Sequence, residues 1–327
     1  MATACTAILG VEDVPNAPNS TTADGGSSGI VSEASTTEGG GGGDREASIA
    51  RYAEAYCRKF SDCAGSGFGA FYADVNECKT LRIASVREFV DLPGTTASAA
   101  DFDGCSSRYA ALTCDVFRSA DSDFTCLLKG SKKPNDRCIF GAQCDSGFCA
   151  TSRNACRGCI AAPAAGADCA ANSACGPGLV CNGDNKCVIP AKVGMSCSAS
   201  KPCAGAAACV AGTCEPLVDS PNAPCTKNPG CDALKGLFCY VPTGDTTGTC
   251  VQVAYSTPGK FCSTVANTGT QFTLCLRLAS CTEASNTCPT LPTKAGDPCG
   301  TDFGECPDPL YCNAGTCAAN PPSSFCE

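Results

Sequence analysis

The ten residues from Gly178 to Cys187, GLVCNGDNKC, place two cysteines on either side of a polar turn. The same arrangement recurs at residues 206–214, AAACVAGTC, and at residues 309–317, PLYCNAGTC. Turns such as Asn182-Gly183 favour positive φ angles, which tight β-hairpins require. We therefore expect a short hairpin with a cysteine on each strand to recur along the chain.

Extending this pattern in both directions gives six units, each with four cysteines and roughly 28 to 37 residues long, a period typical of arrays of small modules. A turn residue stands three positions before the first cysteine of each unit: Asn135, Gly166, Gly194, Asn222, Gly259 and Gly296. The cysteines of the six units, which we expect to form disulfides, are Cys138, Cys144, Cys149 and Cys156; Cys169, Cys175, Cys181 and Cys187; Cys197, Cys203, Cys209 and Cys214; Cys225, Cys231, Cys239 and Cys250; Cys262, Cys275, Cys281 and Cys288; and Cys299, Cys306, Cys312 and Cys317.

Cysteine accounts for 33 of the 327 residues, a fraction typical of disulfide scaffolds in secreted proteins. Metal binding is the competing interpretation. The chain has no His, and the C-x2-C pair of all-cysteine zinc sites occurs once, at Cys156 and Cys159, whereas a zinc ribbon needs two such pairs. We therefore expect disulfides in an oxidising compartment, with no metal and no cofactor.

Four cysteines in a unit allow three pairings. We expect the first to pair with the third and the second with the fourth, because interleaved bridges tie the incoming segment to both hairpin strands. Cys159 and Cys326 then have no local partner, so either they pair over a long distance or the frame shifts and one unit bonds into the next. Two bridges of roughly 3 kcal/mol each cannot offset the ordering of a whole unit, so stacking of neighbours predicts an elongated array.

The N-terminal segment has its own composition. In residues 1–14, Ala2-Thr3-Ala4-Cys5 resembles the end of a bacterial lipobox, with Ala2 at the place of the usual Leu, and this implies a lipid on Cys5. Removing Cys5 leaves an even number of cysteines; an exposed thiol or an intermolecular bridge is the alternative. Residues 15–45 are rich in Gly, Ser and Thr and predict a disordered tether.

A helical pattern begins after the tether. The first helix is predicted over about 46–63, capped by Asp44, with apolar residues at steps of three and four: Ile49, Tyr52, Tyr56, Phe60 and Cys63. Asp74 and Glu77 resemble a capping box for a second helix. A third helix is marked by Phe102, Cys105, Tyr109, Leu112 and Val116. Residues 46–128 are therefore predicted to form a small disulfide-bonded three-helix bundle with six cysteines, followed by the array at residues 129–327.

The unit pattern, a glycine three residues before the first cysteine and a C-x-x-G-x-C hairpin at the end, resembles the Dickkopf N-terminal and EB-type cysteine-rich modules. The whole layout is similar to that of bacterial cysteine-rich surface lipoproteins. This resemblance implies a disulfide topology and a cell-surface location. It carries over no binding activity, because it is confined to cysteines and turns.

No reaction centre has its usual spacing in this chain. The lack of His excludes Ser-His-Asp and Cys-His mechanisms, and the one G-x-S-x-G match, Gly25 to Gly29, lies in the tether without the strand and helix of a nucleophile elbow. Two acidic pairs, Asp101 with Asp103 and Asp121 with Asp123, lack the full EF-hand series and are interpreted as helix caps or solvated acids.

A basic group lies between the helices and the array. Its members, Lys129, Lys132, Lys133 and Arg137, are interpreted as a solvated linker, with contact to surface phosphates as the alternative. The net charge of −9 is uneven: residues 1–46 hold seven acids and one base, which leaves a nearly neutral body with no basic stripe. This charge distribution argues against a nucleic-acid partner.

The sequence thus predicts small disulfide-rich modules in an elongated repeat array of short β-hairpins, preceded by a small α-helical bundle. We expect a non-enzymatic protein on the outer cell surface, lipid-anchored or secreted, that binds protein or glycan, mediates adhesion or builds the envelope. Contact with the membrane is expected through the lipid anchor alone. A secreted protease inhibitor or toxin-like effector is the alternative, and an enzyme that uses only carboxylates is a less favoured one.

Overall fold

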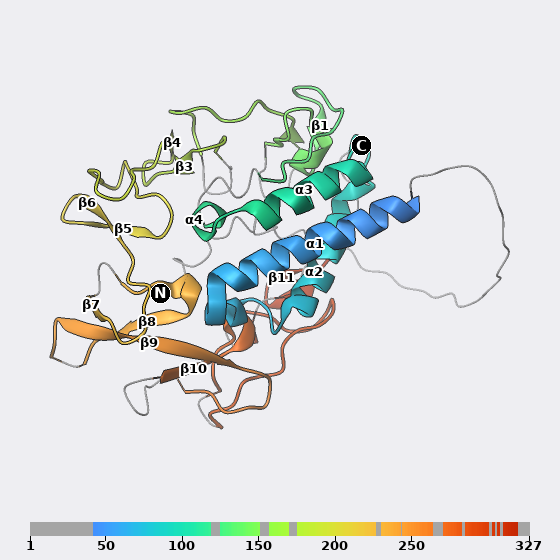
Figure 1. Ribbon diagram of the computed structural model, residues 1–327. Helices are drawn as coiled ribbons and strands as arrows, with labels where there is room; N and C mark the ends of the chain where they lie inside the picture. Colours follow the sequence, from blue (N-terminus) through green and yellow to red (C-terminus); the bar gives the residue numbers. More distant parts are fainter. Residues whose placement is uncertain are drawn as a thin grey trace.

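The computed structural model describes residues 42–118, 125–150, 157–169, 175–226, 230–242, 244–263, 271–282, 285–300, 303–304, 306–307 and 310–319. Residues 1–41, with Cys5, the Gly25–Gly29 match and most of the predicted tether, lie outside this range, as do Asp121, Asp123, Cys156 and Cys326. The described chain is rich in disulfides and in short antiparallel hairpins, and a small helical region stands at its N-terminal end (Figure 1).

The helical region begins with α1 (Gly42–Ala64), which continues into the 3₁₀ helix η1 (Gly65–Ala70). The predicted start at residue 46 was too late. Asp44 does not cap the helix but lies in its first turn, where a negative charge stabilises the helix dipole. Residues 42–45, assigned to the tether from their glycines, are helical.

The next two helices start with side-chain caps. α2 (Val75–Val90) has Asp74 as its N-cap, whose carboxylate accepts the N–H of Glu77 at 2.8 Å. The carboxylate of Glu77 in turn accepts a hydrogen bond from the N–H of Ala73 at 2.6 Å. Ala73 lies one residue before the N-cap, so the arrangement differs from the predicted capping box only in the residue that donates. α3 (Ala99–Ala111) begins with a full capping box between Ser98 and Asp101.

The third helix is shorter than predicted. α3 ends at Ala111 because Leu112 takes an extended conformation, with φ −62° and ψ 143°. Thr113 then caps a new short helix, α4 (Cys114–Phe117), by accepting the N–H of Val116. Val116, expected on the buried face of the third helix, lies on α4 and is exposed.

The core of the helical region is aromatic. The predicted face of α1 is buried, with Ile49 fully enclosed, and Tyr52 packs against Phe102 and Tyr109 of α3 at ring-centroid distances of 5.8 Å. Arg82 of α2 closes one side of this core: its guanidinium lies 4.5 Å from the centroid of the Tyr56 ring and donates to the Tyr52 hydroxyl. Three disulfides, Cys57–Cys78, Cys63–Cys114 and Cys105–Cys126, link the helices and the segment after α4.

Four of the cysteine-rich units contain two-stranded antiparallel hairpins. These are β1 (Arg137–Cys138) with β2 (Arg157–Gly158), β3 (Val180–Cys181) with β4 (Cys187–Val188), β5 (Ala207–Val210) with β6 (Thr213–Pro216), and β11 (Tyr311–Asn313) with β12 (Thr316–Ala318). In three of them the third and fourth cysteines of the unit face each other across the strands, as in the pair Cys209 and Cys214.

A four-stranded sheet joins the fourth and fifth units, which the sequence did not indicate. β9 (Thr247–Ser256) pairs antiparallel with β7 (Pro224–Thr226) and β8 (Leu237–Tyr240), and parallel with β10 (Gln271–Cys275). The parallel pair is possible because the connection 257–270 is long enough for a crossover. The described part of the units also contains three short 3₁₀ helices: η3 (Gly141–Gln143), η4 (Ala233–Lys235) and η5 (Leu276–Leu278).

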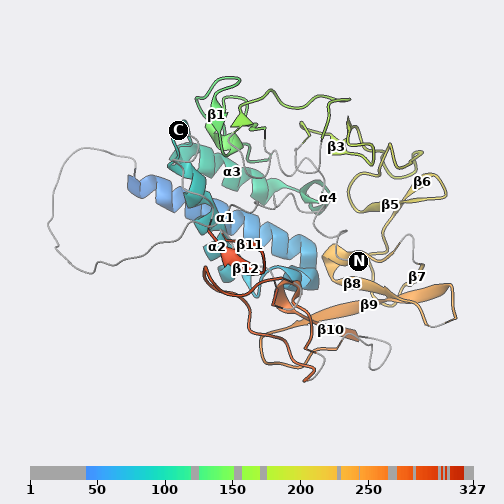
Figure 2. The same ribbon diagram turned by 180° about the vertical axis from the view of Figure 1, so that it is seen from behind.

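The units form an arch around the helices and not the elongated array expected from the sequence. Figures 1 and 2 show β1 to β4 along one side of the helices, β5 and β6 beyond their end, and β7 to β10 along the other side. The reason is that η1 and α2 offer partners to the fourth and fifth units, so these units contact more than their neighbours. Among the described helices, none is both long enough and apolar enough to cross a membrane.

Candidate binding surface of the disulfide units

One backbone arrangement closes each of the six units. The turn residue three positions before the first cysteine has a φ between 63° and 89° in every unit. Its N–H donates to the carbonyl oxygen of the last cysteine, and the N–H of that cysteine donates to the residue after the turn residue, all over 2.8 to 2.9 Å. The turn residues and their cysteines are Asn135 and Cys159, Gly166 and Cys187, Gly194 and Cys214, Asn222 and Cys250, Gly259 and Cys288, and Gly296 and Cys317.

The disulfides of the second to sixth units follow the interleaved order expected from the spacing. The first cysteine is bonded to the third and the second to the fourth: Cys169–Cys181 and Cys175–Cys187, Cys197–Cys209 and Cys203–Cys214, Cys225–Cys239 and Cys231–Cys250, Cys262–Cys281 and Cys275–Cys288, Cys299–Cys312 and Cys306–Cys317. Each of these hairpin cysteines is therefore bonded to a cysteine outside its own hairpin.

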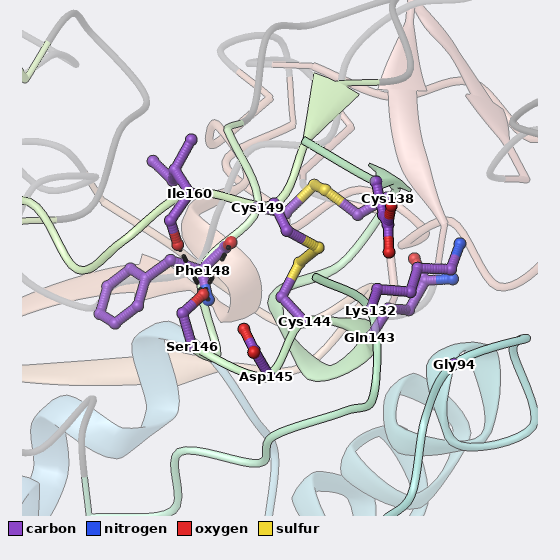
Figure 3. Close-up of a disulfide and its surroundings, with 12 residues drawn as sticks. Gly94, Lys132, Cys138, Gln143, Cys144, Asp145, Ser146, Phe148, Cys149 and Ile160 are labelled. Atoms are coloured by element: carbon purple, nitrogen blue, oxygen red, sulfur yellow. Dashed lines mark hydrogen bonds between the residues drawn. A yellow bond between two sulfur atoms is a disulfide. The ribbon is translucent and has the colours of Figure 1, made fainter. Parts of the chain in front are cut away.

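The first unit has a different fourth cysteine from the one predicted. Cys138 is bonded to Cys149, but Cys144 is bonded to Cys159 and not to Cys156. Figure 3 shows the Cys138–Cys149 bridge with the sulfur of Cys144 in a second bridge beside it. The reason is the closing turn: Asn135 donates to the carbonyl of Cys159, which brings that cysteine next to Cys144.

Groups of cysteine sulfurs lie within 4.8 Å of one another in at least five units, for example those of Cys169, Cys175 and Cys187. Such proximity is also a feature of metal sites. Here it arises because two disulfides cross in each unit, and a sulfur in a disulfide is not the thiolate that binds a metal.

The acidic pair at the start of α3 serves the helical region itself. The pKa of Asp101 lies below its usual value because the Ser98 hydroxyl and the Ser98 backbone N–H both donate to the carboxylate. The pKa of Asp103 is also lowered, first by its hydrogen bonds with Arg51 of α1. Because the two carboxylates bind different partners, they do not converge on one cation.

The basic group lies in a connection whose backbone is bonded to its neighbours, while Lys129, Lys133 and Arg137 are exposed to solvent as predicted. Gly130 donates to the carbonyl of Cys144 at 2.7 Å and Ser131 donates to that of Gly94 at 2.8 Å, so the connection is bonded to the first unit and to the loop before α3. The ammonium of Lys132 donates to the carbonyl of Arg137 at 2.6 Å, and Lys133 pairs with Asp145. The side chains of Lys132 and Lys133 are therefore engaged with groups of the protein itself.

The joint between the helices and the fourth and fifth units contains the buried charges. Arg118, after α4, forms an ion pair with Asp232, and their side chains are 8% and 2% exposed. Arg277 of η5 pairs with Glu77 of α2. Sequence reasoning missed both pairs, because an isolated Arg or Asp in a loop carries no periodic signal.

The backbone also comes close at this joint. A Cβ atom on Gly67 of η1 would lie 2.0 Å from the carbonyl oxygen of Leu234, so only glycine fits. A hollow of about 210 Å³ lies beside this contact, lined by Asp62, Ser66, Lys235 and Gln252 among others. Typical ligand pockets hold about 300 to 1,000 Å³, and Lys235 is already paired with Asp219, so we assign no small-molecule site to it.

Comparisons of the chain with protein-family models, with curated proteins and with solved structures found no match. The resemblance to Dickkopf N-terminal and EB-type modules therefore stays a prediction. What the described geometry offers for binding is a set of exposed closing turns, in units that are each held by two disulfides.

Proposed function

We propose that this chain is a non-enzymatic cysteine-rich protein of the outer cell surface, with its arch of units serving in binding, adhesion or envelope structure. The observation that carries the proposal is the closure of each unit by two crossed disulfides and two backbone hydrogen bonds. Such a unit presents its turns rigidly, which lowers the entropy lost when a partner binds.

The redox environment follows from the cysteines. Fifteen disulfides account for 30 of the 33 cysteines, and the other three, Cys5, Cys156 and Cys326, lie outside the described residues. So many bridges persist in extracellular or otherwise oxidising surroundings. The partner that we propose is a protein or glycan of the envelope.

The lipid anchor at Cys5 is part of the proposal and has its own test. If Cys5 carries a lipid and the other 32 cysteines are bonded, the denatured lipidated protein has no free thiol, and protein made without lipidation has one. Titration of thiols in denaturant measures this number. Several free thiols in properly exported protein would overturn the anchor and the sixteen-bridge scheme together.

Binding is tested with the whole chain, because the fourth and fifth units are held against the helices. The immobilised protein is incubated with an envelope extract and, separately, with a panel of extracellular proteases. We expect a specific envelope partner that is lost after mild reduction of the disulfides. Deleting residues 15–41, which spares α1, should leave this binding unchanged. Tight inhibition of one protease would favour the inhibitor class instead, and substrate turnover abolished by a single Asp or Glu substitution would make the protein an enzyme.

A further inference from the structure

Exposed apolar side chains gather in one short segment of the molecule. Seven large apolar residues are exposed in the described chain, and three of them fall within residues 189–195. Ile189, Val193 and Met195 are 68%, 57% and 53% exposed. We call residues 189–195 the apolar tip. The tip is the first part of the connection between β4 and β5, which lies on the side of the molecule away from the start of α1 (Figure 1).

The fold does not require these side chains, as the second unit shows. Residues 161–167 occupy the same place there, and the residues equivalent to Ile189, Val193 and Met195 are all alanine: Ala161, Ala165 and Ala167. Two backbone features are shared by both units. Gly176 donates to the carbonyl of Pro163, as Ala204 donates to that of Ala191, and both segments close on a glycine with φ above 80°. The larger apolar residues of the third unit are therefore an addition to a turn that closes without them.

The apolar tip is held rigidly in its exposed position. Its centre, Ala191, is buried, and its N–H donates to the carbonyl of Pro202 at 2.8 Å. Met195 donates its N–H to the carbonyl of Lys192 and accepts from the N–H of Cys214. The exposure of the side chains is thus built into the bonded structure of the unit.

Lysines outnumber acids around the tip. Residues 184–215 contain three lysines and two acids, and the acids, Asp184 and Glu215, stand at the two ends of this stretch. Lys186 is paired with Asp168 of the second unit. Lys192 and Lys201 are exposed and form no ion pair with any described residue. The parallel bridge between Ala191 and Cys203 puts Lys201 at the register position of Ile189, so one free cation lies within the tip and one beside it.

We propose that the apolar tip inserts into the interface of an anionic lipid membrane, with Lys192 and Lys201 contacting the headgroups. Three aliphatic side chains flanked by free lysines are the chemistry of interfacial membrane contacts. A protein partner needs a complementary surface of roughly 800 Å² per side, far more than three side chains supply. A second copy of the chain is disfavoured because two tips would bring their lysines together.

The experiment measures co-sedimentation of the full chain, made without lipid on Cys5, with phosphatidylcholine vesicles that contain or lack phosphatidylglycerol. We expect binding to the anionic vesicles. The triple variant Ile189→Ala, Val193→Ala and Met195→Ala, which copies the second unit, should bind at least about tenfold more weakly. Lys192→Gln and Lys201→Gln should each weaken binding roughly fivefold and reduce its dependence on salt. The control Phe261→Ala removes another exposed apolar residue, 54% exposed in the fifth unit, and should bind like the wild type.

A second readout reports directly on insertion. The chain has no Trp, so Val193→Trp introduces a unique fluorophore into the tip, and Ala295→Trp places one at the equivalent turn position of the sixth unit. Anionic vesicles should shift the emission of Val193→Trp to the blue and leave that of Ala295→Trp unchanged. An unshifted Val193→Trp spectrum, equal binding of the triple variant, or capture of a protein by the tip without vesicle binding would each overturn the proposal. These outcomes leave the envelope-binding function untouched, because no anchor and no envelope partner is present in the assay.

Discussion

The guanidinium of Arg277 forms an ion pair with the carboxylate of Glu77, which lies 200 residues earlier in the chain. Arg277 is 10% exposed and has a φ of 52°, a left-handed conformation that is costly for a residue with a side chain. The pair and a hydrogen bond from Arg277 to the carbonyl of Pro292 hold this conformation. The fifth unit is therefore attached to α2 by a charge and not by apolar packing alone.

Removing one member of this pair should destabilise the protein. We expect Glu77→Gln or Arg277→Met to lower the free energy of unfolding by about 2 to 3 kcal/mol, somewhat less than for a fully buried pair because Glu77 is 29% exposed. The double variant should lose less than the sum of the two. Urea denaturation of the oxidised protein measures this coupling. As a control, Arg58→Met breaks the exposed pair with Glu54 and should cost under about 1 kcal/mol; equal losses at both sites would contradict the prediction.

The contact of η1 with the fourth unit depends on Gly67. Gly67→Ala should separate the two backbones and lower the free energy of unfolding by about 2 to 4 kcal/mol, as overpacking and the lost contact combine. The same change at Gly104 inside α3 meets only the end of the Arg108 side chain and should stabilise the helix by about 0.5 to 1 kcal/mol. Thermal unfolding of the two variants should shift the melting temperature in opposite directions.

The frame of the first unit is open to direct mapping. Proteolysis without reduction, followed by mass spectrometry, should yield a linked peptide pair that contains Cys144 and Cys159. The Cys203–Cys214 pair of the third unit serves as the reference in the same digest. Recovery of Cys144 linked to Cys156 would contradict the pairing in the structure and support the pairing predicted from spacing.

The closing turns should tolerate asparagine better than alanine. Gly259 has φ 73° and open space where a Cβ would stand, so Gly259→Ala should cost about 1 to 2 kcal/mol through the backbone alone. Gly259→Asn should cost less, since Asn135 and Asn222 occupy the same position in the first and fourth units with φ 72° and 63°. Equal losses for both substitutions, measured by urea denaturation, would show that the left-handed turn does not limit stability.

Stability should fall in acid partly through the cap of α3. Because the folded-state pKa of Asp101 is lowered from 3.8 by bonds from Ser98, its contribution is present above pH 3.8 and is lost as the pH falls through the folded value. Asp101→Asn and Ser98→Ala should therefore both flatten the decline of unfolding free energy between about pH 5 and about pH 2. The serine variant separates the hydrogen bond from the charge, because it leaves the number of carboxylates unchanged. A decline as steep as in the wild type would show that the bond does not set this pKa.

The sequence predicted what is local. Three features depend only on residues close in the chain: the hairpin cysteines, the left-handed turns at Gly166 and Gly194, and the buried face of α1. Because local backbone geometry sets the spacing of these residues, the spacing was enough to predict them. Cys156 was assigned to the first unit from spacing alone and Cys159 was left without a local partner, because the hydrogen bond from Asn135 that selects Cys159 leaves no trace in the spacing.

The arrangement of the units could not be predicted in the same way. Whether a chain of modules extends or curves depends on a few distant contacts, here Arg118 with Asp232, Arg277 with Glu77, and Gly67 with Leu234. None of these residues belongs to a repeated pattern. The sequence does show that Val193 and Met195 replace alanines of the second unit. It does not show that both side chains are exposed, and this exposure is what indicates a binding role.

The closure of each unit on its own turn also sets an order of assembly. Every disulfide in the six units spans 11 to 19 residues, so a unit that emerges N-terminus first holds everything needed to lock itself before the next one appears. The helices cannot finish so early. η1 packs against Leu234 and α2 pairs with Arg277, and both partners are synthesised much later than the helices. Until these partners have been made, the flank of the helices that contacts them is uncovered. A factor that protects the nascent protein would have this flank of the helices, and not the cysteine units, as the surface it must cover.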